Sequence, residues 1–477
     1  MRSYDMLVIG SGPAGHHAAI QAAKLGKRVA IIERKESVGG VALNAGTIPS
    51  KTLREAVLYL TGFRQRGLYG ASYRVKEDIT LSDLRFRVDH VIAHELDVFR
   101  SHFQRNGVDV VYGAASFLDP FTLRVSGPAN GGNGEDFQGR FIAIATGTRP
   151  ARPAHVPFNG LSVYDTDQLW ELRAERLPKT LTVVGGGVIG IEYACAMAAL
   201  GTQVTLVEKR PRVLDFVDAE IVDALCYHMR TMRTTFRLGE EVSGIVKDEQ
   251  GRIVARLGSN KTIVSEALLY AAGREGNTEQ LDLGAAGLTA DARGRIAVDE
   301  HYRTAVPHIF AAGDVIGFPS LASTSMEQGR LAACAAFGVP CLSMPHLFPY
   351  GIYTVPEIAY VGRNEEQLTV AKIPYEVGVA PYREIARGQI IGDDTGFLKM
   401  LIHQETRQLL GVHIIGEGAT ELIHIGQMVL AHNGTIDVFV NSVFNYPTLA
   451  ECYKVAALAG MNKLATAPVC ELSVPVA

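Results

Sequence analysis

Residues 4–33 read YDMLVIGSGPAGHHAAIQAAKLGKRVAIIE, and their order decides the fold of the N-terminal part of the chain. A short apolar run is followed by a glycine turn, an alanine-rich helical run, a second apolar run and Glu33. Gly10 permits a tight turn, Gly12 lets the backbone approach a pyrophosphate, and Gly15 allows the helix to pack closely on the strand. The helix N-terminus would bind the phosphates, and Glu33 would accept hydrogen bonds from ribose hydroxyls.

The same pattern returns in residues 181–208, LTVVGGGVIGIEYACAMAALGTQVTLVE, with Gly185, Gly187, Gly190 and Glu208. In both copies the acid follows the first glycine by 23 residues, at 33 against 10 and at 208 against 185. One such motif is weak evidence, but two of them with the full strand–helix–strand context indicate an internal duplication that binds two dinucleotides. The alternative, two packing turns in one large sheet, leaves both acids unexplained.

The composition is that of an ordinary globular protein. The 477 residues suggest about three domains, and 47% of them are hydrophobic and 20% charged. A net charge of -4 gives no support to nucleic-acid or polybasic membrane binding, and no apolar run approaches the roughly 20 residues of a membrane helix. The six cysteines lack zinc or CxxC spacing. We therefore expect buried, reduced thiols, no metal site and a cytoplasmic location.

Three further strand-and-glycine runs, at 143–150, 268–278 and 308–314, suggest that the first dinucleotide domain is interrupted by the second and resumes after it. The last run ends in an acid that suits a ribityl hydroxyl near a helix start. The further residues that we expect to line the two dinucleotide sites are Arg34, Thr146, Gly147, Ile189, Gly273, Arg274, Gly313 and Asp314.

In these motifs the chain resembles the class I pyridine nucleotide-disulfide oxidoreductases. These are the two-dinucleotide flavoproteins that include dihydrolipoamide dehydrogenase, glutathione reductase and mercuric reductase. The resemblance covers the chain from Tyr4 to about Leu464. It implies FAD on the first glycine motif, contacted also by Asp314, and a nicotinamide nucleotide on the second. It also implies a C-terminal dimerisation domain that opens near GIYTVPEIAYVG, residues 351–362.

The implied fold is α/β, with two Rossmann-like dinucleotide-binding domains, the second inserted into the first, and a C-terminal α+β dimerisation domain. The expected boundaries are 1–153 and 277–344 for the two parts of the FAD domain, 154–276 for the NAD(P) domain, 345–464 for the dimerisation domain and 465–477 for a flexible tail.

The redox cysteines of the family are missing from this chain. The disulfide reductases read GGxCxNxGCIPSK where residues 39–51 read GGVALNAGTIPSK, so Ala42 and Thr47 occupy the cysteine positions. They also carry HPTxxE, with histidine as the acid/base for the thiols, where residues 446–451 read YPTLAE. A thiol relay needs both sulfurs and a proton shuttle. We therefore expect hydride to pass directly between nicotinamide and flavin, and the intact cofactor motifs argue against the alternative of a damaged enzyme.

One branch of the family, the soluble pyridine nucleotide transhydrogenases, resembles the chain more closely, in GTIPSKTLREAV (46–57) and FNYPT (444–448) among other stretches. It implies FAD-dependent hydride transfer between NADPH and NAD+, the nucleotides NADP+/NADPH and NAD+/NADH alternating at one site with reduced FAD between the two half-reactions. Members of the branch usually keep the first cysteine, where this chain has Ala42. The alternatives are a quinone or dye reductase (diaphorase) of the same fold and a flavin-bearing structural or redox-sensing protein that does not turn over.

The resemblance also assigns roles to single residues. Lys51 would lie beside flavin N5, after a Pro-Ser turn at a helix start, and Glu192 would be its partner on the nicotinamide side. The alternatives are a solvated helix lysine and an ordinary helix acid. Thr47 would pack near the flavin ring, with either a hydrogen-bonding or a space-filling role. Tyr446 and Glu451 would reach the flavin site of the other subunit in a homodimer, and larger assemblies stay open.

The choice of nucleotide is balanced in the sequence. Glu208 suits the 2′-hydroxyl of NAD and repels a 2′-phosphate, whereas Lys209, Arg210 and Arg212 could attract that phosphate. An exposed charge pair contributes only about 0–1 kcal/mol, so neither the acid nor the basic residues decide between NAD and NADP. A mixed site is what a transhydrogenase needs.

Overall fold

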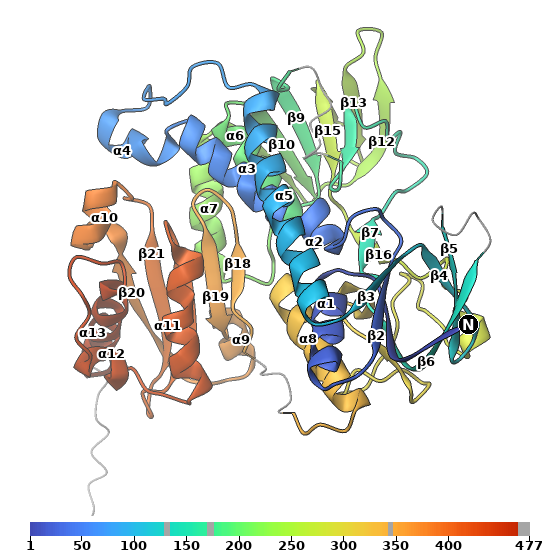
Figure 1. The fold of residues 1–477 in the computed structure, drawn as a ribbon. Helices are drawn as coiled ribbons and strands as arrows, with labels where there is room; N and C mark the ends of the chain where they lie inside the picture. The colour runs from blue at the N-terminus through green and yellow to red at the C-terminus, as the bar shows by residue number, and fades with distance from the viewer. Residues whose placement is uncertain (128–133, 169–175, 342–346, 466–477) are drawn as a thin grey trace, which may run out of the picture. The chain divides into compact units, whose positions relative to one another are not determined.

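A computed structural model describes residues 1–127, 134–168, 176–341 and 347–465. These residues fall into two compact units, each built from several stretches of chain (Figure 1). The first unit comprises residues 1–56, 79–185 and 241–344, and the second comprises 57–78, 186–240 and 345–477. The domain boundaries expected from the sequence stay predictions. The expected tail, residues 465–477, lies outside the described residues except for its first residue.

The first unit is built around a seven-stranded sheet that begins with the opening motif. Strands β1 (Arg2–Ile9) and β2 (Val29–Glu33) pair in parallel, and β2 is buried along its whole length. A run of apolar residues buried on both faces is typical of a parallel sheet. The rest of the sheet is β3 (Asp109–Tyr112), β4 (Ala114–Asp119), β5 (Thr122–Ser126), β6 (Glu135–Ile144) and β17 (Ile309–Ala311).

Strand β17 shows that the late segment returns to the first sheet, because it pairs in parallel with β6. Apolar clusters cover both faces of the sheet, and one of them includes helices α1 (Pro13–Lys24) and α8 (Ala322–Ala336). The two helices touch backbone to backbone, since a Cβ on Gly329 would lie 2.0 Å from the Ala14 carbonyl oxygen. The long helix α5 (Leu81–Arg105) opens with a capping box at Thr80.

The remaining strands of the first unit form three smaller groups. Strands β9 (Thr180–Val184) and β8 (Val163–Asp165) both pair in parallel with β15 (Ala267–Tyr270). Strand β7 (Thr148–Pro150) pairs antiparallel with β16 (Arg274–Gly276). An antiparallel meander consists of β12 (Val242–Lys247), β13 (Ile253–Leu257) and β14 (Thr262–Ser265).

The second unit holds the helix of the second glycine motif. Helix α6 (Val188–Ala199) leads into β10 (Gln203–Glu208), which pairs in parallel with β11 (Thr234–Leu238), and α7 (Ala219–Thr231) connects the two strands. Ten of the twelve residues of α6 are buried, and Glu192 is the charged residue among them. Helix α3 (Thr47–Leu60) passes from the first unit into the second, and α4 (Arg66–Tyr69) follows it.

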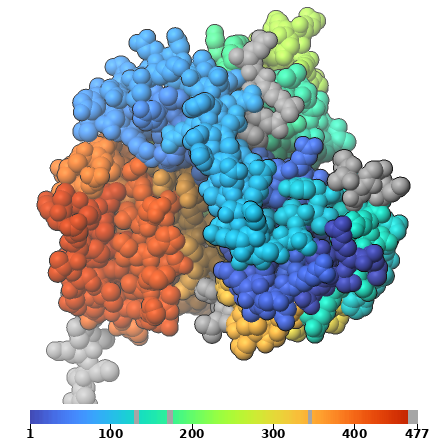
Figure 2. Space-filling view, viewed as in Figure 1, coloured from blue at the N-terminus to red at the C-terminus, as the bar shows by residue number. Residues whose placement is uncertain are grey.

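The C-terminal part of the second unit is an antiparallel sheet with helices. The sheet runs in the order β18 (Tyr350–Ile352), β19 (Ile358–Gly362), β22 (Leu409–Ile415), β21 (Phe397–His403) and β20 (Tyr375–Pro381). Its helices are α9 (Glu365–Val370), α10 (Ala386–Ile391), α11 (Ala419–Ala431), α12 (Asp437–Asn441) and α13 (Glu451–Ala465). This region is the orange-to-red surface in Figure 2, and its exposed apolar side chains include Met428, Val438, Val443 and Leu458.

Candidate active site

The first glycine turn leaves no room for a side chain at Gly10 or at Gly15. Gly10 has φ 98°, and a Cβ there would lie 2.4 Å from the Ala145 carbonyl oxygen. A Cβ on Gly15 would lie 1.8 Å from the Gly10 carbonyl oxygen, so strand and helix meet backbone to backbone. Gly12 caps helix α1 in extended conformation, and a Cβ there would meet the Gly40 Cα at 3.8 Å. The turn therefore presents free backbone N–H groups at a helix start, which suits a pyrophosphate.

Glu33 holds this turn in place. Its Oε2 accepts hydrogen bonds from the Ser11 N–H (3.1 Å) and Ser11 Oγ (2.5 Å), and its Oε1 accepts one from the Lys35 N–H (2.9 Å). The Ser11 hydroxyl in turn accepts the Gly39 N–H at 2.9 Å. Sequence reasoning missed Ser11, although its place between two motif glycines was a usable signal. Arg34, also expected at this site, is exposed.

The second copy repeats this anchoring. Gly185 has φ 109°, and a Cβ there would lie 2.7 Å from the Ala271 carbonyl oxygen. Among the described residues, no atom lies within 4 Å of a Cβ on Gly187. Glu208 Oε2 accepts the Gly186 N–H (2.6 Å), and its Oε1 accepts the Arg210 N–H (2.9 Å). The acid of each copy thus binds the residue after the first glycine and the residue two positions beyond itself, as expected of a duplication.

Arg210 lies directly on the acid of the second copy. Its Nε donates to Glu208 Oε1 at 2.9 Å and its Nη2 to Oε2 at 3.2 Å, while Nη1 donates to Asp215. Burial alone would raise the pKa of Glu208, but the Arg210 hydrogen bonds lower that pKa overall. Glu208 is therefore ionised, and one guanidinium bridges two carboxylates where the ribose of a dinucleotide would bind.

The neighbouring cations are placed differently. Arg212 pairs with Glu366 at 3.3 Å and donates to the Val217 carbonyl oxygen at 3.3 Å, so it is directed toward helix α9. Lys209 is exposed. Two arginines were expected as candidates to bind a 2′-phosphate. Arg210 lies on Glu208, whereas Arg212 pairs with Glu366.

The segment with the missing sulfurs forms two helices. Ala42 lies half-buried in α2 (Gly40–Asn44), and Thr47 is exposed at the first residue of α3. Lys51 is half-buried one turn further along α3. The sequence placed the helix start after the Pro-Ser turn, and this was wrong, because Pro49 lies within the first turn of α3. Proline is tolerated there, since the first N–H groups of a helix have no partner within it.

Glu192 lies on α6 with 8% of its surface exposed, and its Oε1 accepts the Tyr353 N–H at 2.8 Å. This bond fixes the carboxylate against the C-terminal region, a contact that no sequence motif indicated. Ile189 is half-buried and Gly190 is buried. Lys51 belongs to the first unit and Glu192 to the second, so their pairing stays a prediction.

Asp314 is part of a half-buried chain of polar side chains. It accepts a hydrogen bond from Thr148 Oγ1 at 3.3 Å, and Arg274 Nε donates to the same hydroxyl at 2.9 Å. Arg274 Nη1 also donates to Asp167 at 2.8 Å. Burial raises the pKa of Asp314, and Arg274 and Thr148 reduce that shift. Arg274 thus donates to Thr148 and Asp167, and its expected role at a nucleotide stays a prediction.

Two glycines shape this part of the first unit. Gly313 has φ 81° and donates its N–H to Gln328 Oε1 at 2.8 Å, and Gly273 has φ 117°. Next to the first glycine turn, the Thr146 hydroxyl is buried, and no protein partner accompanies it among the described residues. Gly147 follows with φ 64°. An unsatisfied buried hydroxyl beside a tight glycine turn is the arrangement expected where a bound cofactor supplies the missing hydrogen bond.

Tyr446 and Glu451 differ in exposure. The Tyr446 side chain is 69% exposed. Glu451 is the first residue of α13, and its Oε2 is buried with no hydrogen-bond partner in the described part of the chain. Their roles at a subunit interface stay predictions.

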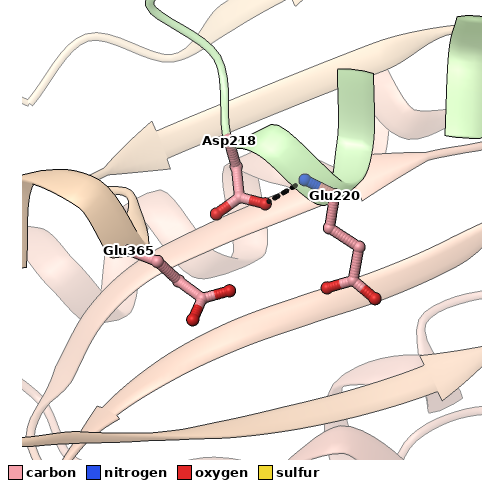
Figure 3. Close-up of side chains that lie close together, drawn as sticks. All are labelled: Asp218, Glu220 and Glu365. Carbon is pink, nitrogen blue, oxygen red and sulfur yellow. Dashed lines mark hydrogen bonds between the residues drawn. The ribbon is translucent and has the colours of Figure 1, made fainter. Parts of the chain in front are cut away.

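Three carboxylates gather within the second unit, at Asp218, Glu220 and Glu365 (Figure 3). The Lys399 ammonium lies among them, 2.9 Å from Asp218 Oδ1 and 2.9 Å from Glu220 Oε2, and it also contacts Glu365. The Lys399 side chain is fully buried. Burial would raise the pKa of Asp218, but His413 and Lys399 lower it overall. These acids therefore hold a lysine and join α7, α9 and β21.

The pyridine nucleotide-disulphide oxidoreductase family model matches residues 4–329, and the dimerisation domain of that family matches residues 348–457. The chain belongs to this family. The resemblance read from the sequence is thereby confirmed, and so is the α/β fold class with a C-terminal dimerisation domain.

Curated relatives match over almost their whole length. A soluble pyridine nucleotide transhydrogenase of Mycobacterium bovis is 56% identical over 464 residues, 97% of this chain and 98% of the relative. One of Hahella chejuensis is 45% identical over 466 residues, 97% of this chain and 99% of the relative. Among solved structures, the HOCl-induced flavoprotein disulfide reductase RclA of Escherichia coli is 26% identical with TM-score 0.85, covering 95% of this chain and 99% of its own.

Five of the six cysteines lie in the described part of the chain. Cys195, Cys226, Cys334 and Cys452 are buried free thiols, as expected. Cys341 is exposed, so the expectation of buried thiols was wrong there; it lies in the chain that follows helix α8, outside the packed core. Within the described ranges, no helix is both long and apolar enough to cross a membrane.

Proposed function

We propose that this oxidoreductase is an FAD-dependent transhydrogenase that moves hydride between NADPH and NAD+ at one nucleotide site. The observation that carries the proposal is the combination of two anchored dinucleotide turns with Ala42 and Thr47 at the positions of the redox cysteines. Relatives that share about half of the sequence and nearly the full length are named soluble pyridine nucleotide transhydrogenases, which supports it.

FAD would be held by the first turn and would accept a hydride from one nucleotide and return it to another. The N-terminus of α1 would bind its pyrophosphate, and the Thr146 hydroxyl and Asp314 lie where β6 and β17 end. Glu33 keeps the turn in shape through Ser11, so it would face the ribose with an already oriented carboxylate.

The reacting end would depend on Lys51 and Glu192. Lys51 would supply positive charge where negative charge develops. Glu192 is oriented by the Tyr353 N–H and would align the nicotinamide. With no thiol at residues 42 and 47, hydride would leave by the nicotinamide side on which it entered.

The second turn would accept both nucleotides because its charges are balanced. Ionised Glu208 would accept a hydrogen bond from the 2′-hydroxyl of NAD, and Arg210 would donate to the 2′-phosphate of NADP. Since each charge already neutralises the other, neither nucleotide faces an unopposed like charge.

The family's dimerisation domain, residues 348–457, supports a homodimer. In it, Tyr446 and Glu451 would narrow the flavin site of the other subunit. We place the protein in the cytoplasm, since its described cysteines are free thiols. Cell fractionation with an antibody would test that location.

The deciding assay mixes the FAD-loaded protein with NADPH and a thio-NAD analogue and no other acceptor. Sustained reduction of the analogue is expected, and the variant Lys51→Met should slow it while retaining FAD. The proposal would be contradicted if NADPH reduced the flavin but the thio-NAD analogue could not reoxidise it. Reduction of a quinone far faster than the exchange between nucleotides would also contradict it.

A further inference from the structure

Helix α8 ends in a turn that brings two cysteines together. Gly338 has φ 67°, and the Val339 N–H donates to the Cys334 carbonyl oxygen at 2.9 Å. This is the reversal that commonly closes a helix with glycine in the left-handed conformation. Pro340 and Cys341 follow, so Cys341 comes two residues after the N–H group that is bonded to Cys334.

The two thiols at this turn are in contact. The Cys334 side chain is hydrogen-bonded to that of Cys341, and the positive charge of Arg330 acts on both thiols. Cys334 is 1% exposed, whereas Cys341 is exposed to solvent. One sulfur can therefore be reached by a small oxidant, and the second lies beside it and is shielded.

We propose that Cys334 and Cys341 form a reversible intrachain disulfide, a modification site separate from both dinucleotide turns. The proposal rests on the turn and the thiol contact alone, and it stands whether or not the protein is a transhydrogenase. The oxidant is a peroxide.

The chemistry balances in two steps with hydrogen peroxide. The Cys341 thiolate attacks one peroxide oxygen, the O–O bond breaks, and a sulfenic acid and hydroxide form. The Cys334 sulfur then attacks the Cys341 sulfur, the S–S bond forms, the S–O bond breaks and a second hydroxide leaves. The two hydroxides take up the two protons released by the thiols and become water. The two cysteines together lose two electrons, which reduce the peroxide. A dithiol such as dithiothreitol reverses the reaction by exchange.

The surroundings set the order and speed of these steps. Burial and the contact with Cys341 raise the pKa of Cys334 to about 11, and Arg330 partly opposes this shift. Few Cys334 thiolates are present at neutral pH, so the second step, which consumes no peroxide, should be slow. Peroxide should therefore be kept near one equivalent, because an excess would oxidise the waiting sulfenic acid further. Cys226 serves as a matched control thiol, because it is also buried, and burial rather than another cysteine raises its pKa to about 11.

The bond would act on a helix that supports the first dinucleotide turn. Helix α8 packs backbone to backbone on α1 at Gly329, and its Gln328 holds the Gly313 N–H. The disulfide would tie the far end of α8 to the chain that leaves it.

The test treats the full-length protein with hydrogen peroxide, alkylates the free thiols under denaturing conditions and maps tryptic peptides. Cleavage after Arg330 and Arg363 places both cysteines, and no other, in one peptide, 331–363. The expected peptide has lost both alkylation sites and the mass of two hydrogens, and dithiothreitol restores both sites. Cys226→Ser should leave this result unchanged.

Two variants separate the steps. In Cys334→Ser, Cys341 should stop at a sulfenic acid that dimedone traps, and in Cys341→Ser, Cys334 should stay fully alkylatable. Loss of Cys341 in the wild type through further oxidation or bonding to another molecule, with Cys334 still alkylatable, would overturn the proposal.

A measurement without oxidant covers the case in which a variant misfolds. Phenylarsine oxide bridges two adjacent thiols, so the reduced wild-type protein should retain it on peptide 331–363 in a one-to-one ratio. Failure of the folded wild-type protein to retain the arsenical on this peptide would contradict the thiol contact itself.

Discussion

At the scale of single residues, Arg210 is the side chain on which nucleotide choice should depend. It bridges Glu208 and Asp215, so its charge is available to a 2′-phosphate only in competition with two carboxylates. Arg210→Gln should weaken NADPH binding about 10-fold to 100-fold, because a hydrogen bond to a charged group is worth about 1.5–3 kcal/mol. NADH binding should change little, since Glu208 keeps its Gly186 bond. Equilibrium titration of each nucleotide measures both effects.

Arg212→Gln is the matched control, because Arg212 is engaged by Glu366 and the Val217 carbonyl oxygen. It should leave both affinities unchanged. Equal losses of NADPH and NADH affinity in Arg210→Gln would mean that Arg210 shapes the turn without discriminating between nucleotides.

His16 should make the stability of the fold depend on pH. It is buried beside Phe99 and Phe103, and burial lowers its pKa to about 3. At a pH between about 3 and 6.5, the His16 imidazole is protonated in the unfolded chain but not in the folded chain. The free energy of unfolding therefore falls as the pH drops through this window. The loss between pH 7 and pH 5 should be about 2 kcal/mol. His16→Phe should remove this part of the pH dependence of the thermal midpoint.

His90→Phe provides the comparison, since His90 is exposed on α5. Its thermal midpoint should follow the wild-type pH profile. If His16→Phe also keeps the wild-type slope between pH 7 and pH 5, another group is responsible for it.

At the scale of elements, the contact of α1 with β1 requires glycine. Gly15→Ala would place a Cβ 1.8 Å from the Gly10 carbonyl oxygen, and neither backbone can move without opening the turn. We expect a cost of about 3 kcal/mol or more and loss of FAD. Flavin content and the thermal midpoint measure the two effects.

Gly284→Ala tests whether any added methyl group is harmful, because no atom of the described residues lies within 4 Å of a Cβ there. It should keep FAD and the wild-type midpoint. A flavin-replete, stable Gly15→Ala protein would contradict the proposed packing of the turn.

At the scale of the whole molecule, Lys399 ties a helix of the nucleotide region to the C-terminal sheet. Lys399→Met would leave Asp218, which is 1% exposed, as an uncompensated buried charge. Breaking one side of a buried pair costs about 3–5 kcal/mol. Urea unfolding of the single variant should show this loss, and adding Asp218→Asn should recover much of it.

The exposed pair of Arg124 and Asp136 sets the scale for comparison. Arg124→Gln should leave the free energy of unfolding nearly unchanged, since solvent screens such pairs. A loss in Lys399→Met no larger than this would show that the buried cluster relaxes or takes up a proton instead.

The sequence by itself determined the family, the two dinucleotide turns and the absence of a thiol relay. These follow from local chemistry: only glycine tolerates the φ of 98° at Gly10 and the close approach at Gly15, and only sulfur could have carried electrons at positions 42 and 47. The acids Glu33 and Glu208 could be found because they close a strand at fixed spacing from a glycine.

The tertiary structure alone decided which groups these residues meet. Three contacts show this. A loop brings Arg210 onto Asp215, and residues distant in sequence meet in the Tyr353–Glu192 hydrogen bond and in the Lys399 cluster. No periodicity encodes such contacts, because they depend on how separate elements pack. The exposed Cys341 beside the buried Cys334 is a further case, since only the turn at Gly338 brings the two thiols together.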